Sequence, residues 1–145
     1  MLEPDLGVLP HFNPDLEGSE PQPVLQFRER LRSADAVIIS SPEYAHGIAG
    51  VLKNALDWVV GSGELSGKPV ALFNASPRAT FAQTSLAEVI RTMDARIVDA
   101  ASIALPLLGK NMAAEGIVKN DELATQIRGA LCQIGLSIQS DGLKA

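Results

Sequence analysis

Two short apolar runs, each followed by a loop and then by an amphipathic stretch, constrain the fold of this chain more than any other feature. Residues 36–41 read Ala-Val-Ile-Ile-Ser-Ser, and residues 69–74 read Pro-Val-Ala-Leu-Phe-Asn. Both runs are short, mainly apolar and without regular alternation, as is typical of strands covered on both faces in a parallel sheet. Alternation of such strands with helices predicts a parallel α/β sheet with right-handed crossovers.

The helices are predicted from apolar residues that recur at the spacing of one helical face. Such a face follows the first strand and consists of Ile48, Val51, Leu52, Ala55, Leu56 and Val59. The same periodicity predicts helices over residues 21–33 and 81–94. A last helix, capped by Asn120 or Asp121, would bury one stripe made of Leu123, Ile127, Leu131 and Ile134.

The remaining segments are less regular. A third strand is predicted between residues 97 and 104, and residues 106–119 are predicted to be mostly loop. Five prolines interrupt the first 23 residues, which therefore read as a loop that runs over the surface.

Composition excludes several classes of function. With 17 acidic against 12 basic residues the net charge is −5, which disfavours binding to nucleic acid or to an anionic membrane. No apolar run reaches the length of a membrane helix, and the N-terminus does not resemble a signal peptide, so a cytoplasmic location is predicted. The single cysteine, Cys132, is predicted to be an inert thiol near the buried stripe of the last helix, and no metal site is expected.

Two loops are the candidate ligand site. Parallel α/β sheets bind ligands where the carboxyl ends of strands open into loops, here loops 42–47 and 75–80. Both lead into helix N-termini, where free N–H groups favour electron-rich ligand atoms. The pattern alone favours plain strand-to-helix turns in which Tyr44 is a half-buried packing residue.

These loops carry a resemblance to a known family. Residues 41–58 read SPEYAHGIAGVLKNALDW and resemble the signature of the NAD(P)H-dependent FMN reductase family, and residues 75–83 resemble the segment after that family's next strand. The resemblance extends over about residues 6–138 and implies a flavodoxin-like three-layer α/β/α sandwich, with residues 1–145 forming a single domain. It also implies FMN as cofactor, NADPH or NADH as electron donor, a homodimer or homotetramer, and quinone, azo, metal-oxyanion or free flavin acceptors.

The resemblance implies that residues of both loops bind the flavin ring. The implied cofactor-binding residues are Pro42, Glu43, Tyr44, Ala45, His46, Gly47, Ala75, Ser76, Pro77 and Arg78. Backbone N–H groups of the first loop would stabilise negative charge at N1 and O2 of the reduced ring. No residue is assigned a catalytic role, because flavin hydride chemistry needs no obligatory general acid. Arg78 is expected beside the flavin, at a phosphate of the nicotinamide cofactor, or simply in solvent.

The chain also departs from the family pattern. It has Ala45 where relatives commonly have Asn, and Ala49 where they have Pro. The family's first strand, Gly-Ser-x-Arg-x-x-Ser phosphate loop, first helix and second strand have no counterpart, so the chain is expected to be truncated at its N-terminus by about forty residues. Strand 36–41 would then be an exposed edge, and flavin binding would be weakened.

Two other interpretations therefore remain open at this stage. The chain is either a reductase or a non-catalytic remnant or dimerisation module that binds no flavin. A generic nucleotide-binding half-domain is disfavoured because Gly-x-Gly-x-x-Gly is absent. Lys53, Asn54, Asp57 and Trp58 share a helix face that is either a dimer contact or an exposed polar face with one stray tryptophan.

Overall fold

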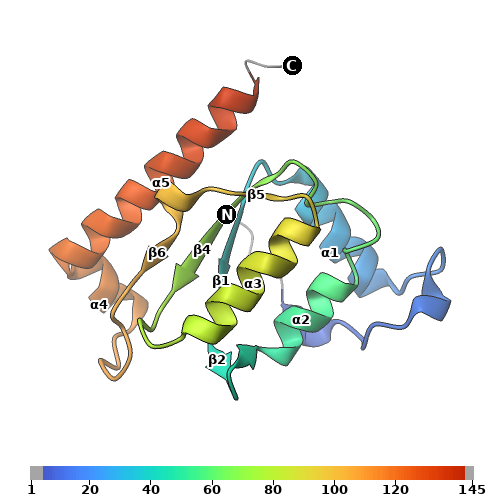
Figure 1. The fold of residues 1–145 in the computed structure, drawn as a ribbon, viewed down its shortest axis with the longest axis horizontal. Coiled ribbons are helices and arrows are strands. Elements are labelled where there is room, and N and C mark those ends of the chain that lie inside the picture. The colour runs from blue at the N-terminus through green and yellow to red at the C-terminus, as the bar shows by residue number, and fades with distance from the viewer. Residues whose placement is uncertain (1–4, 143–145) are drawn as a thin grey trace.

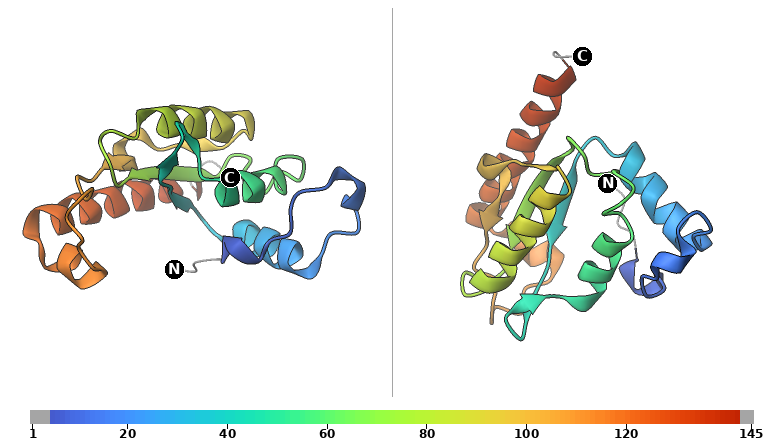
Figure 2. Two further views of the ribbon diagram at one scale, coloured as in Figure 1. Left: turned by 90° about the horizontal axis from the view of Figure 1, so that it is seen from below. Right: turned by 45° about the vertical axis from the view of Figure 1, so that its right-hand side comes forward.

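The computed structural model describes residues 5–142, which form a four-stranded parallel sheet with helices on both faces (Figure 1). β1 (Val37–Ser40) pairs with β4 (Pro69–Asn74), which pairs in turn with β5 (Arg96–Ile97) and β6 (Ile103–Ala104). Figure 2 shows α3 on one face of the sheet and α5 on the other. The predicted α/β sandwich is thereby confirmed.

The main helices lie where apolar periodicity predicts them. α1 spans Gln22–Ser33, α3 spans Thr80–Thr92, and α5 spans Asp121–Gly142. The N–H of Leu123 donates to Oδ1 of Asn120 at 3.0 Å, so the predicted cap of the last helix is confirmed.

The start of the second helix differs from the prediction, because the residues after β1 first form a β-hairpin. β2 (Glu43–Tyr44) pairs antiparallel with β3 (Gly47–Ile48), and α2 begins only at Gly50 and ends at Asp57. The two turn residues, Ala45 and His46, have φ of +49° and +59°. Positive φ at both central residues is the geometry of a type I′ turn, which closes two-residue hairpins.

Both strands were predicted to be covered on both faces, and this is confirmed for β4 but not for β1. Residues 69–72 of β4 are all buried, as expected for a strand covered on both faces. In β1, by contrast, Ile38 is 36% exposed and Ser40 is exposed. Among the described strands β1 pairs with β4 alone, so the expectation that strand 36–41 forms an edge of the sheet is confirmed; α5 packs on β4, on β6 and on the 3₁₀ turn Asp99–Ala101.

The C-terminal half carries four further corrections. The predicted third strand is divided into β5 and β6, and a short helix, α4 (Ala114–Lys119), lies within the predicted loop. Leu131 is 44% exposed rather than buried, because Ala130 occupies the buried face of α5 beside Leu123 and Ile134. Cys132 is exposed on the same helix, so the prediction of a thiol near the buried stripe is wrong.

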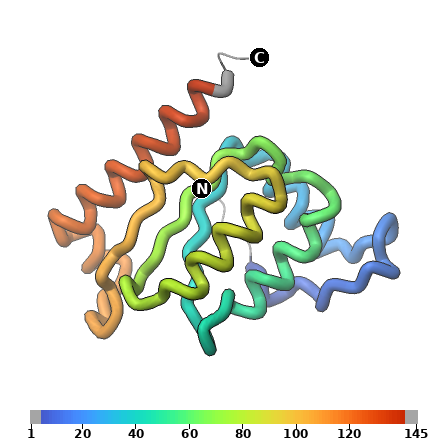
Figure 3. Tube along the Cα trace, in the orientation of Figure 1, coloured from blue at the N-terminus to red at the C-terminus, as the bar shows by residue number. Residues whose placement is uncertain are grey.

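The N-terminal segment is irregular as predicted, with two 3₁₀ turns at Leu6–Val8 and Pro14–Leu16, but it is fastened to α2 (Figure 3). Asn54 accepts a hydrogen bond from Phe12 N at 2.8 Å and donates to the carbonyl of Pro10 at 3.0 Å. The indole Nε1 of Trp58 donates to the same carbonyl at 2.8 Å, and its ring meets that of Phe12 edge-on. Trp58 is only 4% exposed, so its interpretation as a stray surface tryptophan is wrong.

Candidate functional site

The two predicted loops emerge side by side at one edge of the sheet. β1 and β4 are parallel neighbours with Ser40 opposite Phe73, so the turns that follow them start at the same level (Figure 1). The hairpin 43–48 follows β1, and the turn 75–79 follows β4 and leads into α3.

The second turn is closed by a residue that the sequence reasoning did not single out. Asn74 is buried, accepts a hydrogen bond from Ser76 N at 2.9 Å, and donates to the carbonyl of Ala79 at 3.1 Å. A single amide side chain therefore holds both ends of the turn. The sequence feature that could have indicated this role is the position of Asn74, an amide residue at the end of an otherwise apolar strand.

The hairpin is joined to the N-terminus of α3. Oε2 of Glu43 accepts a hydrogen bond from Ala82 N at 2.8 Å. The rings of His46 and Phe81 also meet, with centroids 4.4 Å apart and an angle of 62° between their planes. The structure thus brings loops 42–47 and 75–80 together, with the Glu43 carboxylate occupied by the protein itself.

The two turns present unpaired main-chain donors. Within residues 5–142, the N–H groups of Ala45, His46 and Arg78 donate to no protein acceptor. Pro42 and Pro77 have no N–H group and can only shape the turns. The side chain of Tyr44 is 67% exposed, so its interpretation as a half-buried packing residue is wrong.

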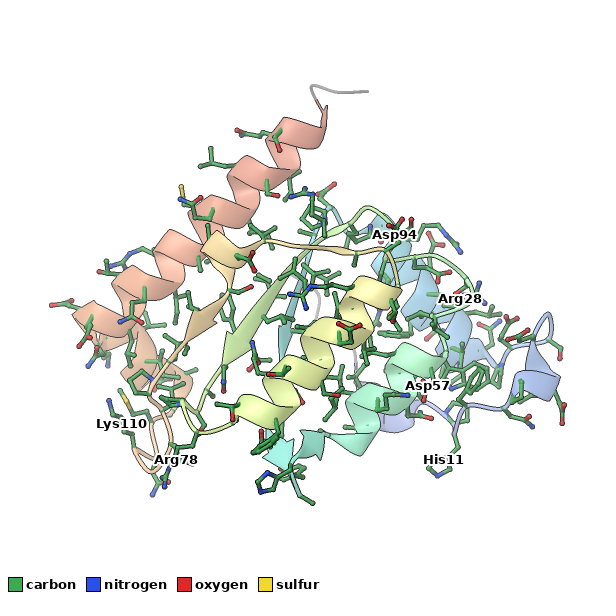
Figure 4. All side chains as sticks on the ribbon, in the orientation of Figure 1. His11, Arg28, Asp57, Arg78, Asp94 and Lys110 are labelled. Atoms are coloured by element: carbon green, nitrogen blue, oxygen red, sulfur yellow. The ribbon has the colours of Figure 1, made fainter. Side chains whose placement is uncertain are left out.

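Positive charge gathers beside the second turn. Leu107 N donates to the carbonyl of Ala75 at 3.2 Å, which places the loop after β6 against this turn. Arg78 and Lys110 both lie at this edge of the sheet (Figure 4). Among the described residues neither forms an ion pair, so both remain available to an anionic group such as a phosphate.

The other polar cluster of the molecule lies at the opposite edge of the sheet. A broad surface hollow there is lined in part by Arg32, Asp35 and Lys68. Its central carboxylate, that of Glu64, is already bound by Arg28 at 2.9 Å and by Arg32 at 3.1 Å. Because these charged groups pair with one another, we interpret the cluster as a structural ion-pair network. The two turns at the carboxyl ends of β1 and β4 are the better candidate for a ligand site. No group of three or more His, Cys, Asp or Glu residues that could hold a metal ion occurs in the described part of the chain.

Comparison with known proteins bears on both turns. A family model described as NADPH-dependent FMN reductase matches residues 4–109. An NAD(P)H-dependent FMN reductase of Pseudomonas aeruginosa is 44% identical over 75 residues, which cover 50% of this chain and 40% of that protein. A 2-hydroxy-1,4-benzoquinone reductase of a Burkholderia species is 35% identical over 96 residues, covering 62% of this chain and 52% of that protein.

A solved structure agrees with these matches. FerB, a flavoenzyme NAD(P)H:(acceptor) oxidoreductase from Paracoccus denitrificans, superposes with a TM-score of 0.79 at 29% identity, covering 94% of this chain and 79% of that one. The chain spans about half the length of the curated relatives it matches. No helix among the described residues combines the length and the apolar character needed to cross a bilayer.

Proposed function

The chain belongs to the NADPH-dependent FMN reductase family, and on that basis we propose that it is an FMN-dependent NAD(P)H oxidoreductase. The match over residues 4–109 contains both turns and confirms the resemblance inferred from their residues. The family's cofactor is FMN, with NAD(P)H as electron donor. When bound, FMN accepts a hydride from the nicotinamide and passes electrons to a second substrate.

The observation that carries this proposal is the junction of the two turns. The pyrimidine edge of the flavin ring carries hydrogen-bond acceptors, and the unpaired N–H groups of Ala45, His46 and Arg78 belong to two turns that are linked through Glu43 and α3. We assign the flavin ring to residues 42–47 and 75–78, that is Pro42, Glu43, Tyr44, Ala45, His46, Gly47, Ala75, Ser76, Pro77 and Arg78.

The chain's own residues serve binding and orientation in this proposal. The hairpin amides donate to the edge of the ring that becomes negative on reduction, and the exposed side chain of Tyr44 packs beside it. Arg78, with Lys110 at the same edge, binds a phosphate of the nicotinamide cofactor. No side chain is assigned a proton-transfer role.

The electron acceptor is proposed to be a quinone or a similar small molecule. The Burkholderia relative is named for reduction of a hydroxybenzoquinone, and the name of FerB leaves its acceptor open. The rival interpretation, a remnant that binds no flavin, is disfavoured by the family match and by the ordered geometry of both turns.

We also propose a single-domain, cytoplasmic homodimer or homotetramer. NADPH and NADH are intracellular metabolites, which favours the cytoplasm. Asn54 and Trp58 are covered by the chain's own N-terminal segment, so the proposed contact uses the exposed remainder of α2 and its end, where Val51 is 56% and Val60 50% exposed.

The test is an assay of FMN-dependent turnover with the full chain. Oxidation of NADPH and of NADH is followed at 340 nm with 1,4-benzoquinone as acceptor, with and without added FMN. The proposal predicts turnover that requires both protein and FMN. A rate equal to that of FMN alone would contradict the reductase and support the remnant.

A further inference from the structure

The carboxylate of Glu43 is turned toward the neighbouring helix. It lies 2.8 Å from Ala82 N, which belongs to a residue 39 positions further along the chain. α3 begins at Thr80, so the N–H of Ala82 is one of the first-turn amides that have no acceptor within the helix. Glu43 therefore satisfies an amide that the helix itself cannot.

α3 has no capping group of its own. Its N-cap residue is Ala79, whose methyl side chain makes no capping hydrogen bond, and its first turn contains no acidic residue. A carboxylate at a helix N-terminus is favoured both by the hydrogen bond and by the helix dipole. The hairpin thus contributes from a distance what Ser, Asp or Asn usually contributes locally.

This bond fixes one turn relative to the other. The second turn is held internally by Asn74 and ends where α3 begins. The first turn contains Glu43, so its hydrogen bond to Ala82 connects the hairpin to α3, the helix that directly follows the turn carrying Arg78. The ring contact of His46 with Phe81 joins the same two elements a second time.

We propose that Glu43 is a positioning residue, whose carboxylate sets where the hairpin 43–48 stands relative to the turn 75–79. The inference rests on the proposed function, because its consequence is that amides of both turns reach one flavin ring. The bond to Ala82 N gives the Glu43 side chain a role in the site other than contact with the ring.

The experiment compares the full chain with Glu43→Ala, Glu43→Asp, Glu43→Gln and the control Glu88→Ala. Glu88 is an exposed carboxylate on the same helix. Three properties are measured: the FMN dissociation constant, the visible circular dichroism of bound flavin, and its midpoint potential. Far-UV circular dichroism checks folding. Amide NMR shifts of Ala45 and His46 without FMN report on the hairpin alone.

Positioning predicts a graded result. Glu43→Ala weakens FMN binding about tenfold, as loss of a charge-assisted hydrogen bond implies. It also changes the visible dichroism, lowers the midpoint potential and moves the hairpin amide shifts. Glu43→Asp keeps the charge on a shorter side chain, and we expect it to change the same properties in the same direction. It serves in place of Glu43→Ala if the alanine variant does not fold. Glu43→Gln keeps the acceptor and restores most of the wild-type values, and Glu88→Ala changes nothing.

The inference is overturned if folded Glu43→Ala or Glu43→Asp leaves the dichroism, the potential and the hairpin shifts unchanged, even if its stability falls. Failure of the proposed function gives a different result. In that case the wild-type chain binds no FMN. The amide NMR shifts of Ala45 and His46, which are measured without FMN, still decide whether Glu43 positions the hairpin 43–48.

Discussion

The tip of the hairpin places two non-glycine residues in the left-handed region. Ala45 and His46 have φ of +49° and +59°, a conformation that costs an L-residue about 1–2 kcal/mol. Asparagine tolerates this conformation better than alanine, and type I′ turns prefer it. The Asn that the family resemblance indicates at position 45 would therefore suit the backbone of this turn better than alanine does. The chain stores strain where the flavin is proposed to bind.

Replacing Ala45 should relieve part of this strain. We expect Ala45→Asn to raise the free energy of unfolding by about 0.5–1 kcal/mol, because Asn adopts positive φ at a lower cost. Urea denaturation measures the change. The matched variant Ala45→Val should lower stability, since a β-branched residue is the least tolerant of positive φ. Stabilisation by valine would show that the turn is not strained.

At the scale of elements, an ion-pair network joins α1 to the segment after α2. The Glu64 side chain is 1% exposed and accepts from Arg28 at 2.9 Å and from Arg32 at 3.1 Å. Ser62 also donates to it. Burial by itself would raise the pKa of Glu64, but the hydrogen bonds from Ser62 and Arg28 and the charge of Arg28 together hold that pKa below its ordinary value of 4.5.

This lowered pKa makes the network sensitive to acid. The contribution of Glu64 to stability is complete above about pH 4.5 and is lost as the pH falls through the folded-state pKa. We expect Glu64→Gln to lower the free energy of unfolding by about 2 kcal/mol at pH 7. The difference in free energy of unfolding between this variant and the wild type should become smaller below pH 4.5. Urea denaturation repeated from pH 7 to pH 3 measures that difference. Glu88→Gln, at an exposed position, is the control. If Glu64→Gln is less stable than the wild type by the same amount at pH 3 and at pH 7, this account is refuted.

The N-terminal segment is held by α2 through Asn54 and Trp58. Asn54→Ala removes hydrogen bonds at 2.8 Å and 3.0 Å, and we expect a loss of about 1–2 kcal/mol in the free energy of unfolding. Limited proteolysis should also cut residues 5–20 faster. Lys53→Ala, which breaks only a surface pair with Asp57, is the control and should change stability by less than about 0.5 kcal/mol. Equal effects of the two variants would mean that Asn54 does not hold the segment.

The elements that could be predicted are those with a long repeating pattern. α1, α3 and α5 and the strands β1 and β4 follow from apolar periodicity and from uninterrupted apolar runs. The hairpin 43–48 could not be predicted, because Ala45 and His46 are poor residues for the turn they form and give no turn signal. The exposure of Ile38 depends on which elements cover the edge strand β1, and no local pattern contains that information.

The adjacency of the two loops could be predicted, but the contacts within and between them could not. The positions of loops 42–47 and 75–80 follow from the rule that parallel strands place their following loops at one edge of the sheet, and the family resemblance implies residues 42–47 and 75–78 within them. The bonds of Glu43 and Asn74 depend on pairs that are brought together only by folding. Arg78 was singled out alone, and Lys110, at the same edge, lies in a segment whose sequence suggested only a loop.

At the scale of the whole molecule, the two edges of the sheet have different roles. The amino edge holds the ion-pair network of Glu64, in which the charged groups are paired. The carboxyl edge holds two connected turns with unpaired amides and two unpaired cations among the described residues. Binding of an anionic, electron-rich cofactor is therefore expected at the carboxyl edge, where its charge is stabilised.

The most direct test of this account is to locate FMN on the chain by amide NMR. ¹⁵N-labelled full-length protein is titrated with FMN, and shift changes are mapped onto assigned N–H groups. The account predicts the largest changes at Ala45, His46 and Arg78, with both turns responding along one binding curve. Changes confined to residues around Glu64, or none at any FMN concentration, would contradict it.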